Sequence, residues 1–175
     1  MYKVDITGEK VGKRGLLSIK KISSLAIFLA AVFLVEWIGH KLTFTSVNDW
    51  YMALQKPDWN PPNWVFGPVW TLLYITIAVS VWLVSIKAKS SSLKKNGYKI
   101  CALQLFCNVL WSYFFFFLQS PGLALIDLVL LIVLIGINIL VFARLYRPAA
   151  ILLIPYFFWT LYATALNAAI WSLNR

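Results

Sequence analysis

Five long apolar runs constrain this chain more than any other feature of its sequence. They cover residues 22–42, 63–86, 98–118, 121–143 and 149–172. Each run holds the roughly 20 residues with which an α-helix, rising 1.5 Å per residue, crosses about 30 Å of hydrocarbon. Because five spanning helices use most of the chain, we expect an all-α integral membrane bundle of five transmembrane helices and no soluble domain.

The overall composition supports a membrane protein. Hydrophobic residues make up 61% of the chain and charged residues 13%, whereas soluble proteins average about 45–50% and about 25%. We expect the first run to be a retained helix, because it exceeds the apolar core of about 7–15 residues in a cleaved signal peptide. It also carries Glu36 and lacks a small-residue cleavage site.

Polar and helix-breaking residues separate the runs. The connections include a Ser/Lys/Gly-rich segment at 87–99, a Ser-Pro-Gly break at 120–122 and a basic segment at 144–148. Such short connections predict that sequential helices are antiparallel neighbours. We expect residues 1–21 to form a basic, mobile N-terminal extension and residues 22–175 to form the membrane domain.

The distribution of Lys and Arg predicts the orientation of the bundle. Most of them lie in the N-terminal segment and in the 87–99 and 144–148 connections, whereas the other side has only Lys41, Lys56 and Arg175. By the positive-inside rule, the N-terminus is cytoplasmic and the loop 43–62 extracytoplasmic. We expect a multi-pass protein of the plasma (inner) membrane, with an organelle membrane as the alternative. Topology and anionic lipid account for the net charge of +10, so we expect the lipid bilayer as a partner and no nucleic acid.

The inventory of reactive side chains narrows the chemistry. The chain has one His, His40, and two Cys, Cys101 and Cys107, which lie about 240° apart around one predicted helix. We therefore expect no metal site, no haem held by two axial side chains and no Ser-His-Asp arrangement. Glu36 and His40 are one turn apart, and we interpret Glu36 as snorkelling to the interface or pairing with His40 or Lys41.

Asp127 allows two interpretations. It lies about a turn and a half into the fourth run, where a carboxylate is costly unless it is paired or faces a wet cavity. A functional role and a structural hydrogen bond to a neighbouring helix remain equal alternatives.

Polar and aromatic residues form stripes on three of the predicted helices. The stripes are Trp70 and Tyr74, then Gln104, Asn108, Trp111 and Ser112, then Pro155, Trp159, Ala163, Asn167 and Trp171. Their helical spacing predicts a shared interior lined with indole rings. The alternative is that they form interfacial aromatic belts and hydrogen bonds between helices.

Residues 50–70, WYMALQKPDWNPPNWVFGPVW, hold four Trp and four Pro. With Tyr74, this stretch resembles the signature of the TspO/MBR family, the tryptophan-rich sensory proteins and translocator proteins, also called peripheral-type benzodiazepine receptors. Gln104-x-x-x-Asn108-x-x-Trp111 and Pro155-Tyr156-x-x-Trp159 follow in the same order and spacing as in the family. The resemblance covers about residues 22–172.

The resemblance implies a five-helix bundle, commonly a homodimer, that binds tetrapyrroles such as protoporphyrin IX or haem. Its implied role is sensing, transport or regulation of porphyrin metabolism, with no cofactor required. Carried over by motif, the ligand-binding residues are Tyr51, Trp70, Asn108, Trp111, Phe114, Trp159, Ala163 and Leu166. Sterol binding, known in animal members, is doubtful here because no Tyr stands between Leu166 and Arg175 to complete the sterol-recognition pattern.

Two other functions remain as alternatives. Some bacterial members are reported to degrade porphyrin in light, so Trp159 is a candidate catalytic residue, with Trp111 as a second possible redox partner. The second alternative is that the chain acts as a structural or regulatory partner of another membrane protein.

The prolines predict a stiff loop, because they fix φ and remove backbone donors. We expect the loop 43–62 to close the pocket, with Tyr51 and Trp70 facing inward and Lys56 meeting a ligand carboxylate. The predicted rim of this lid comprises Lys56, Pro57, Trp59, Pro61 and Pro62.

Overall fold

The computed structural model describes residues 13–89 and 91–175, and every regular element in these ranges is helical. The elements are α1 (Lys13–Thr43), α2 (Trp50–Ala53), α3 (Asn63–Lys87), α4 (Ser92–Ser112), the π-helical turn η1 (Tyr113–Phe117), α5 (Pro121–Leu145), α6 (Arg147–Ile151) and α7 (Ile154–Leu173). Five helical segments, at 21–43, 63–87, 92–117, 121–145 and 147–173, are long and apolar enough to cross a membrane. The predicted all-α membrane bundle is confirmed.

The first helix begins earlier than the apolar run predicts. α1 starts at Lys13, because residues 13–21 contain no proline and nothing in this segment stops a helix before the run. The predicted N-terminal extension is therefore helical over its last part, and residues 1–12 lie outside the described residues.

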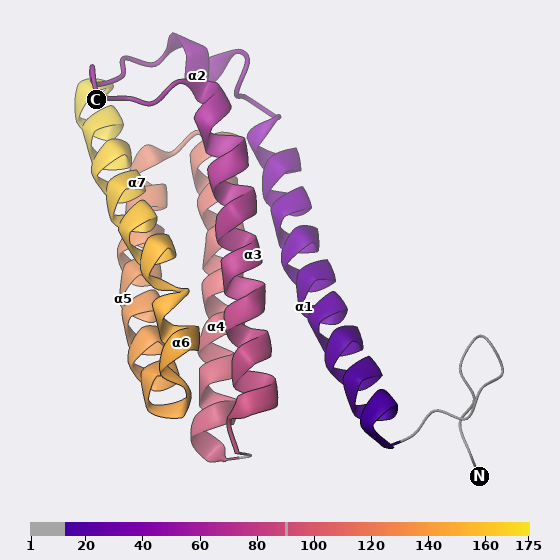
Figure 1. Ribbon diagram of the computed structural model, residues 1–175. Helices are drawn as coiled ribbons and strands as arrows, with labels where there is room; N and C mark the ends of the chain where they lie inside the picture. Colours follow the sequence, from indigo (N-terminus) through magenta and orange to yellow (C-terminus); the bar gives the residue numbers. More distant parts are fainter. Residues whose placement is uncertain (1–12, 90) are drawn as a thin grey trace, which may run out of the picture.

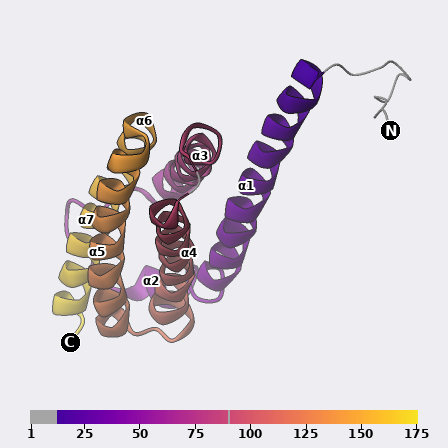
Figure 2. The same ribbon diagram turned by 90° about the horizontal axis from the view of Figure 1, so that it is seen from below.

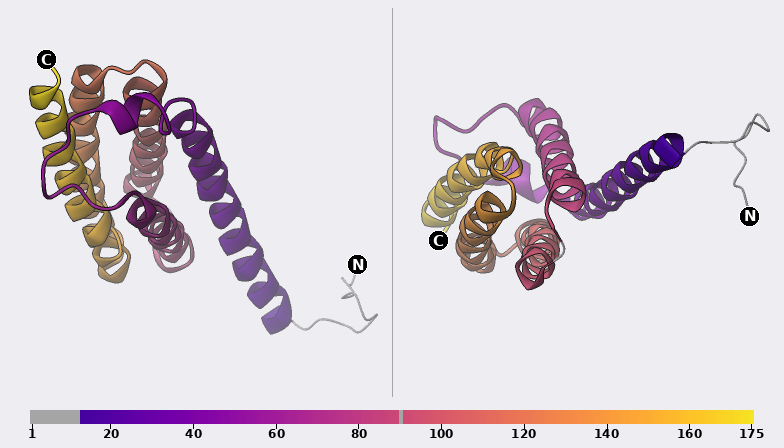
Figure 3. Two further views of the ribbon diagram at one scale, coloured as in Figure 1. Left: turned by 90° about the horizontal axis from the view of Figure 1, so that it is seen from above. Right: turned by 60° about the horizontal axis from the view of Figure 1, so that its bottom comes forward.

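The long helices are arranged as a ring (Figure 1, Figure 3). α1 packs against α3 and α4, α5 packs against α4 and α7, and α6 and α7 reach α3 to complete the circuit. Sequential helices are neighbours at α1–α3, α4–α5 and α5–α7, as predicted. Backbone approaches between α3 and α4 are fewer, and α1 packs on both of them.

α1 forms an outer wall of this ring. It leans away from the other helices toward its N-terminal end (Figure 1, Figure 2). Between residues 21 and 43 only Val32 is fully buried. The Trp82 indole of α3 donates a hydrogen bond of 2.9 Å to the Lys21 carbonyl and ties down this end of α1. α1 therefore packs along α3 and α4 while burying few of its own side chains completely.

The other four helices pack tightly in the half of the bundle that contains the α3–α4 and α5–α6 connections. Val84, Phe142 and Leu153 are fully buried there. The Ser80 hydroxyl donates to the Ala149 carbonyl at 2.7 Å, which links α3 to α6. A cavity of about 240 Å³ lies between α1, α3 and α4 toward this half, and the larger interior space lies in the half beneath the loop 43–62.

The turn η1 ends α4 with an extra residue per turn. Leu118 N–H donates to the Tyr113 carbonyl at 2.9 Å, the i→i+5 bond of a π-helix. Gln119 then adopts φ 49°, the left-handed conformation that commonly follows a helix. Pro121 starts α5 at its first turn, where a missing N–H has no cost. The π-helical turn, Gln119 and Pro121 together form the connection between α4 and α5, next to the loop 43–62.

We predict that Gly97→Ala destabilises the bundle relative to Gly136→Ala. A Cβ on Gly97 would lie 2.8 Å from the buried Phe142 ring, whereas one on Gly136 meets its nearest neighbour, the Phe157 ring, at 3.8 Å. Both changes gain the same helix propensity, so their difference isolates the overpacking, which costs about 1–3 kcal/mol. Thermal unfolding in detergent, followed by circular dichroism, should give Gly97→Ala the lower midpoint. Equal midpoints would contradict the close α4–α5 contact.

A cavity beneath the loop

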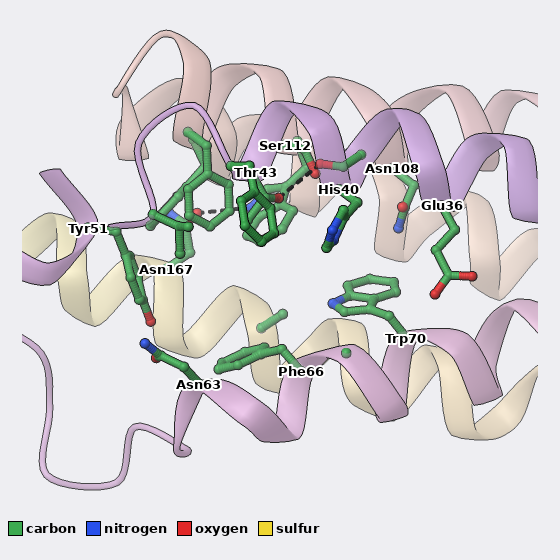
Figure 4. A pocket seen from close by; sticks show the side chains of 18 of the residues that line it. Glu36, His40, Thr43, Tyr51, Asn63, Phe66, Trp70, Asn108, Ser112 and Asn167 are labelled. Atoms are coloured by element: carbon green, nitrogen blue, oxygen red, sulfur yellow. Dashed lines mark hydrogen bonds between the residues drawn. The ribbon is translucent and has the colours of Figure 1, made fainter. Parts of the chain in front are cut away.

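A cavity of about 500 Å³ lies beneath the loop 43–62 and is walled by α1, α3, α4 with η1, and α7 (Figure 4). Its volume is within the range of about 300–1,000 Å³ that small-molecule sites occupy. It occupies the half of the bundle that the apolar core leaves open. The ring of helices thus encloses a space large enough for a ligand.

Most of the predicted ligand-binding residues line this cavity. They are Tyr51, Trp70, Asn108, Trp111, Trp159, Ala163 and Leu166. Phe114 does not line it, whereas Phe115 and Phe116 do. The π-helical turn is the reason, because its wider turn directs these two rings inward, where they are buried at 2% and 7% exposure. No sequence pattern marks that turn in the run of four Phe.

Aromatic rings in contact with one another form one wall of the cavity. Trp111 stacks on Phe115, with centroids 5.5 Å apart and an interplanar angle of 28°. Trp70 lies 6.5 Å from Trp111 and 5.9 Å from Tyr74, tilted by 30° and 35°. Offset and tilted pairs of this kind are favourable. They present a broad, flat apolar surface to whatever occupies the space.

The polar residues of the predicted stripes bond to one another across helices. The Tyr74 hydroxyl donates to Asn108 Oδ1, linking α3 to α4. The Trp111 indole donates to Asn167 Oδ1 at 3.2 Å, and Asn167 Nδ2 donates to the Pro121 carbonyl at 2.7 Å. From the sequence, a shared interior and hydrogen bonds between helices were alternative roles for these residues. In the structure the same residues do both.

Trp159 supplies a polar group with no partner. Its Nε1 is buried and makes no hydrogen bond within the described part of the chain, although its ring packs 6.0 Å from Phe66 and 5.6 Å from Tyr162. Trp159 also lines the cavity. A buried donor left unpaired is costly, so Trp159 Nε1 is a candidate to gain a hydrogen bond when a molecule binds in the cavity.

The loop is held in place over the cavity from both sides. The Ser46 hydroxyl donates to the Phe116 carbonyl at 2.7 Å, and the Tyr162 hydroxyl donates to the Trp59 carbonyl at 2.8 Å. Gln55 and Asn174 exchange two hydrogen bonds of 2.9 Å. The loop therefore spans from η1 to the end of α7.

The predicted rim residues lie in this loop but not in the lining of the cavity. Their positions are Lys56, Pro57, Trp59, Pro61 and Pro62. The Lys56 ammonium lies 4.5 Å from the centre of the Tyr51 ring, and Tyr51 itself lines the cavity. Partial burial lowers the pKa of the Lys56 amine. Burial raises the pKa of the Tyr51 phenol, and its hydrogen bond with Asn60 opposes that shift.

α1 contributes side chains that the sequence interpretation did not place in the site. Glu36, His40 and Thr43 line the cavity, each within a turn of the next. The Thr71 hydroxyl donates to Glu36 Oε1 at 2.5 Å, so the carboxylate turns inward instead of pairing with Lys41. The Lys41 ammonium lies 5.8 Å from the centre of the Trp37 ring. The i, i+4 spacing of Glu36 and His40 indicates that both side chains lie on one face of α1, and this pattern could have placed them together in the site.

Asp127 lies outside the cavity lining. It is buried on α5, where its carboxyl meets the Cys107 thiol of α4. Of the two interpretations from sequence, this position favours a structural contact between α4 and α5.

Comparison with known proteins places this fold among its relatives. The profile of the TspO/MBR family matches residues 27–172. The tryptophan-rich protein TspO of Chlorobaculum tepidum is 39% identical over 159 residues, which cover 89% of this chain and 98% of that protein. The protein of the same name from Archaeoglobus fulgidus is 37% identical over 87% of this chain and 98% of its own. The human translocator protein is 33% identical over 85% of this chain and 88% of its own.

We predict that Asn167→Leu lowers the stability of the bundle. The change removes the acceptor of the Trp111 indole and the donor to the Pro121 carbonyl, and leaving such buried groups unpaired costs about 1–3 kcal/mol. The midpoint of thermal unfolding in detergent should fall, while Ser172→Leu, at an exposed position near the end of α7, should leave it nearly unchanged. Similar midpoints for the two variants would show that the Trp111–Asn167–Pro121 link contributes little.

Proposed function

The chain belongs to the TspO/MBR family of membrane proteins, and from that premise we propose that it binds a tetrapyrrole, a porphyrin or haem-like molecule, in the cavity beneath the loop 43–62. The bound molecule would serve in sensing, transport or regulation of porphyrin metabolism. Such a ligand is flat and apolar on both faces and carries carboxylates at one edge. It therefore needs aromatic surfaces, a few polar contacts and a cation near the opening.

The observation that carries this proposal is the aromatic wall together with the unpaired Trp159 indole. Trp70, Trp111 and Phe115 offer a surface for a planar macrocycle. Trp159 Nε1, buried and without a partner among the described residues, offers a donor to a carbonyl or carboxylate.

The loop supports a defined orientation of the ligand. The Lys56 ammonium lies 4.5 Å from the centre of the Tyr51 ring, just outside the cavity lining, and Glu36 supplies a carboxylate on the α1 wall. Opposite charges attract and like charges repel most strongly where water is scarce. The carboxylate edge of a porphyrin would therefore point to Lys56 and away from Glu36. The homodimer, the plasma-membrane location and the cytoplasmic N-terminus stay predictions from the sequence and the family.

We predict that Trp159→Phe weakens porphyrin binding while the fold is retained. The change keeps an aromatic ring but removes the unpaired N–H, and one hydrogen bond contributes about 0.5–1.5 kcal/mol, or roughly two- to tenfold in affinity. Quenching of Trp fluorescence by protoporphyrin IX in the dark measures it. Ala163→Trp, which fills the cavity, should weaken binding more, and Leu161→Trp, on the exposed face of α7, is its control. Equal affinities for all four proteins would remove the cavity assignment.

The same samples test the enzymatic alternative. Under illumination, porphyrin absorbance would decay faster with the wild-type protein than with Trp159→Phe if Trp159 took part in degradation. Equal decay would leave binding as the function.

We predict that Lys56→Gln weakens binding of protoporphyrin IX but not of its dimethyl ester. The ester has the same ring and no carboxylate, so only the free acid can use the ammonium. A partly exposed ion pair of this kind is worth at most about 1 kcal/mol, or roughly fivefold in affinity. The measurement is the ratio of the two affinities, at low salt, for the wild type and the variant. A ratio that does not change would place the carboxylates elsewhere.

A further inference from the structure

The single histidine of the chain lies in the cavity wall. His40 belongs to α1, one turn after Glu36, and both line the cavity. Its ring packs against Phe44, with centroids 4.5 Å apart and an angle of 51° between the planes. This contact with the next turn of the helix restricts the ring and sets its direction.

The imidazole of His40 has no partner within the described part of the chain. No hydrogen bond or ion pair engages either ring nitrogen, and the nearest carboxylate in sequence, Glu36, has one oxygen occupied by the Thr71 hydroxyl. His40 is exposed at the cavity wall and makes no hydrogen bond, so the nitrogen that carries no hydrogen in its neutral imidazole is free for a ligand. A neutral imidazole offers one lone pair on a nitrogen, which is among the commonest metal ligands in proteins.

An aromatic side chain of α3 lies on the same side of the cavity as His40. Figure 4 shows the His40 imidazole directed toward the Trp70 indole. A planar ring placed between them would have a nitrogen donor on one face and an aromatic side chain on the other. Trp70 is itself supported by Tyr74 and Trp111, at 5.9 Å and 6.5 Å.

We propose that His40 is the axial ligand of a metal-containing tetrapyrrole, so that the cavity selects metallated over metal-free macrocycles. The inference rests on the proposed function and adds the class of ligand to it. The lone pair of a neutral imidazole nitrogen forms a coordinate bond to the metal, which fills a vacant axial position or releases a weakly held water. No electron is transferred and no proton moves. Within the described residues no group of three His, Cys, Asp or Glu could hold a free metal ion, so the macrocycle supplies the other ligands.

Zinc protoporphyrin IX tests this proposal, because zinc in a porphyrin takes a single axial ligand and has no redox chemistry. The metal-free porphyrin has the same outline and serves as the matched control ligand. Wild-type protein in detergent, titrated in the dark, should shift the Soret band of the zinc porphyrin to longer wavelength. His40→Ala should abolish that shift and weaken binding of the zinc porphyrin by on the order of tenfold, the effect of about 1.4 kcal/mol. Its affinity for metal-free protoporphyrin should fall less, so that the preference of the protein for the zinc porphyrin is lost.

Two further variants sharpen the assignment. His40→Gly leaves space for a free imidazole, and added imidazole should restore the shifted band in this variant but not change the wild type. Lys41→Ala, beside His40 in sequence but outside the cavity lining, should keep the shift.

The outcomes separate the inference from the proposed function. A shift that persists in His40→Ala, or that disappears in Lys41→Ala, would overturn the assignment of His40. Metal-free porphyrin that binds, with no shift of the zinc porphyrin in the wild type, would overturn the inference and leave the proposed function standing. Failure of both porphyrins to bind would overturn both.

Discussion

The cavity depends on hydrogen bonds that join helices inside a hydrocarbon environment. A side-chain amide cannot turn to water there, so it bonds to another helix. Asn108 accepts from Tyr74, and Asn167 connects Trp111 to the start of α5 at Pro121. These two amides fix α3, α4, α5 and α7 around the space and set the angle of the Trp111 ring. The aromatic wall is therefore rigid before any ligand arrives.

The sequence predicted the scaffold and most of the cavity wall, because both follow from repeating patterns. Apolar runs of membrane length predicted the five spanning helices, and helical spacing predicted that Trp70, Asn108, Trp111 and Trp159 face a common interior. The family motif added Tyr51 to the predicted lining and predicted that the loop 43–62 covers the cavity. Side chains that repeat at helical spacing lie on one face of the helix, so the position of the helix alone decides where they point.

Three features could not be predicted, each for a physical reason. The π-helical turn replaces Phe114 by Phe115 and Phe116 in the lining, and local sequence does not specify it. Glu36 turns inward because Thr71, on another helix, offers a hydroxyl. The place of His40 in the wall depends on how α1 packs against the other helices. Contacts between distant segments decide all three.

The shallow packing of α1 has a consequence for how such a protein can diversify. A helix with a single fully buried residue between positions 21 and 43 contributes little to global stability, so its side chains can change at small cost. Yet Glu36, His40 and Thr43 contribute the acid, the imidazole and a hydroxyl of the cavity. Most fully buried side chains lie on the other four helices, whereas α1 adds an acid and an imidazole to the cavity lining. New ligand preferences can therefore arise on α1 without a compensating change in the core.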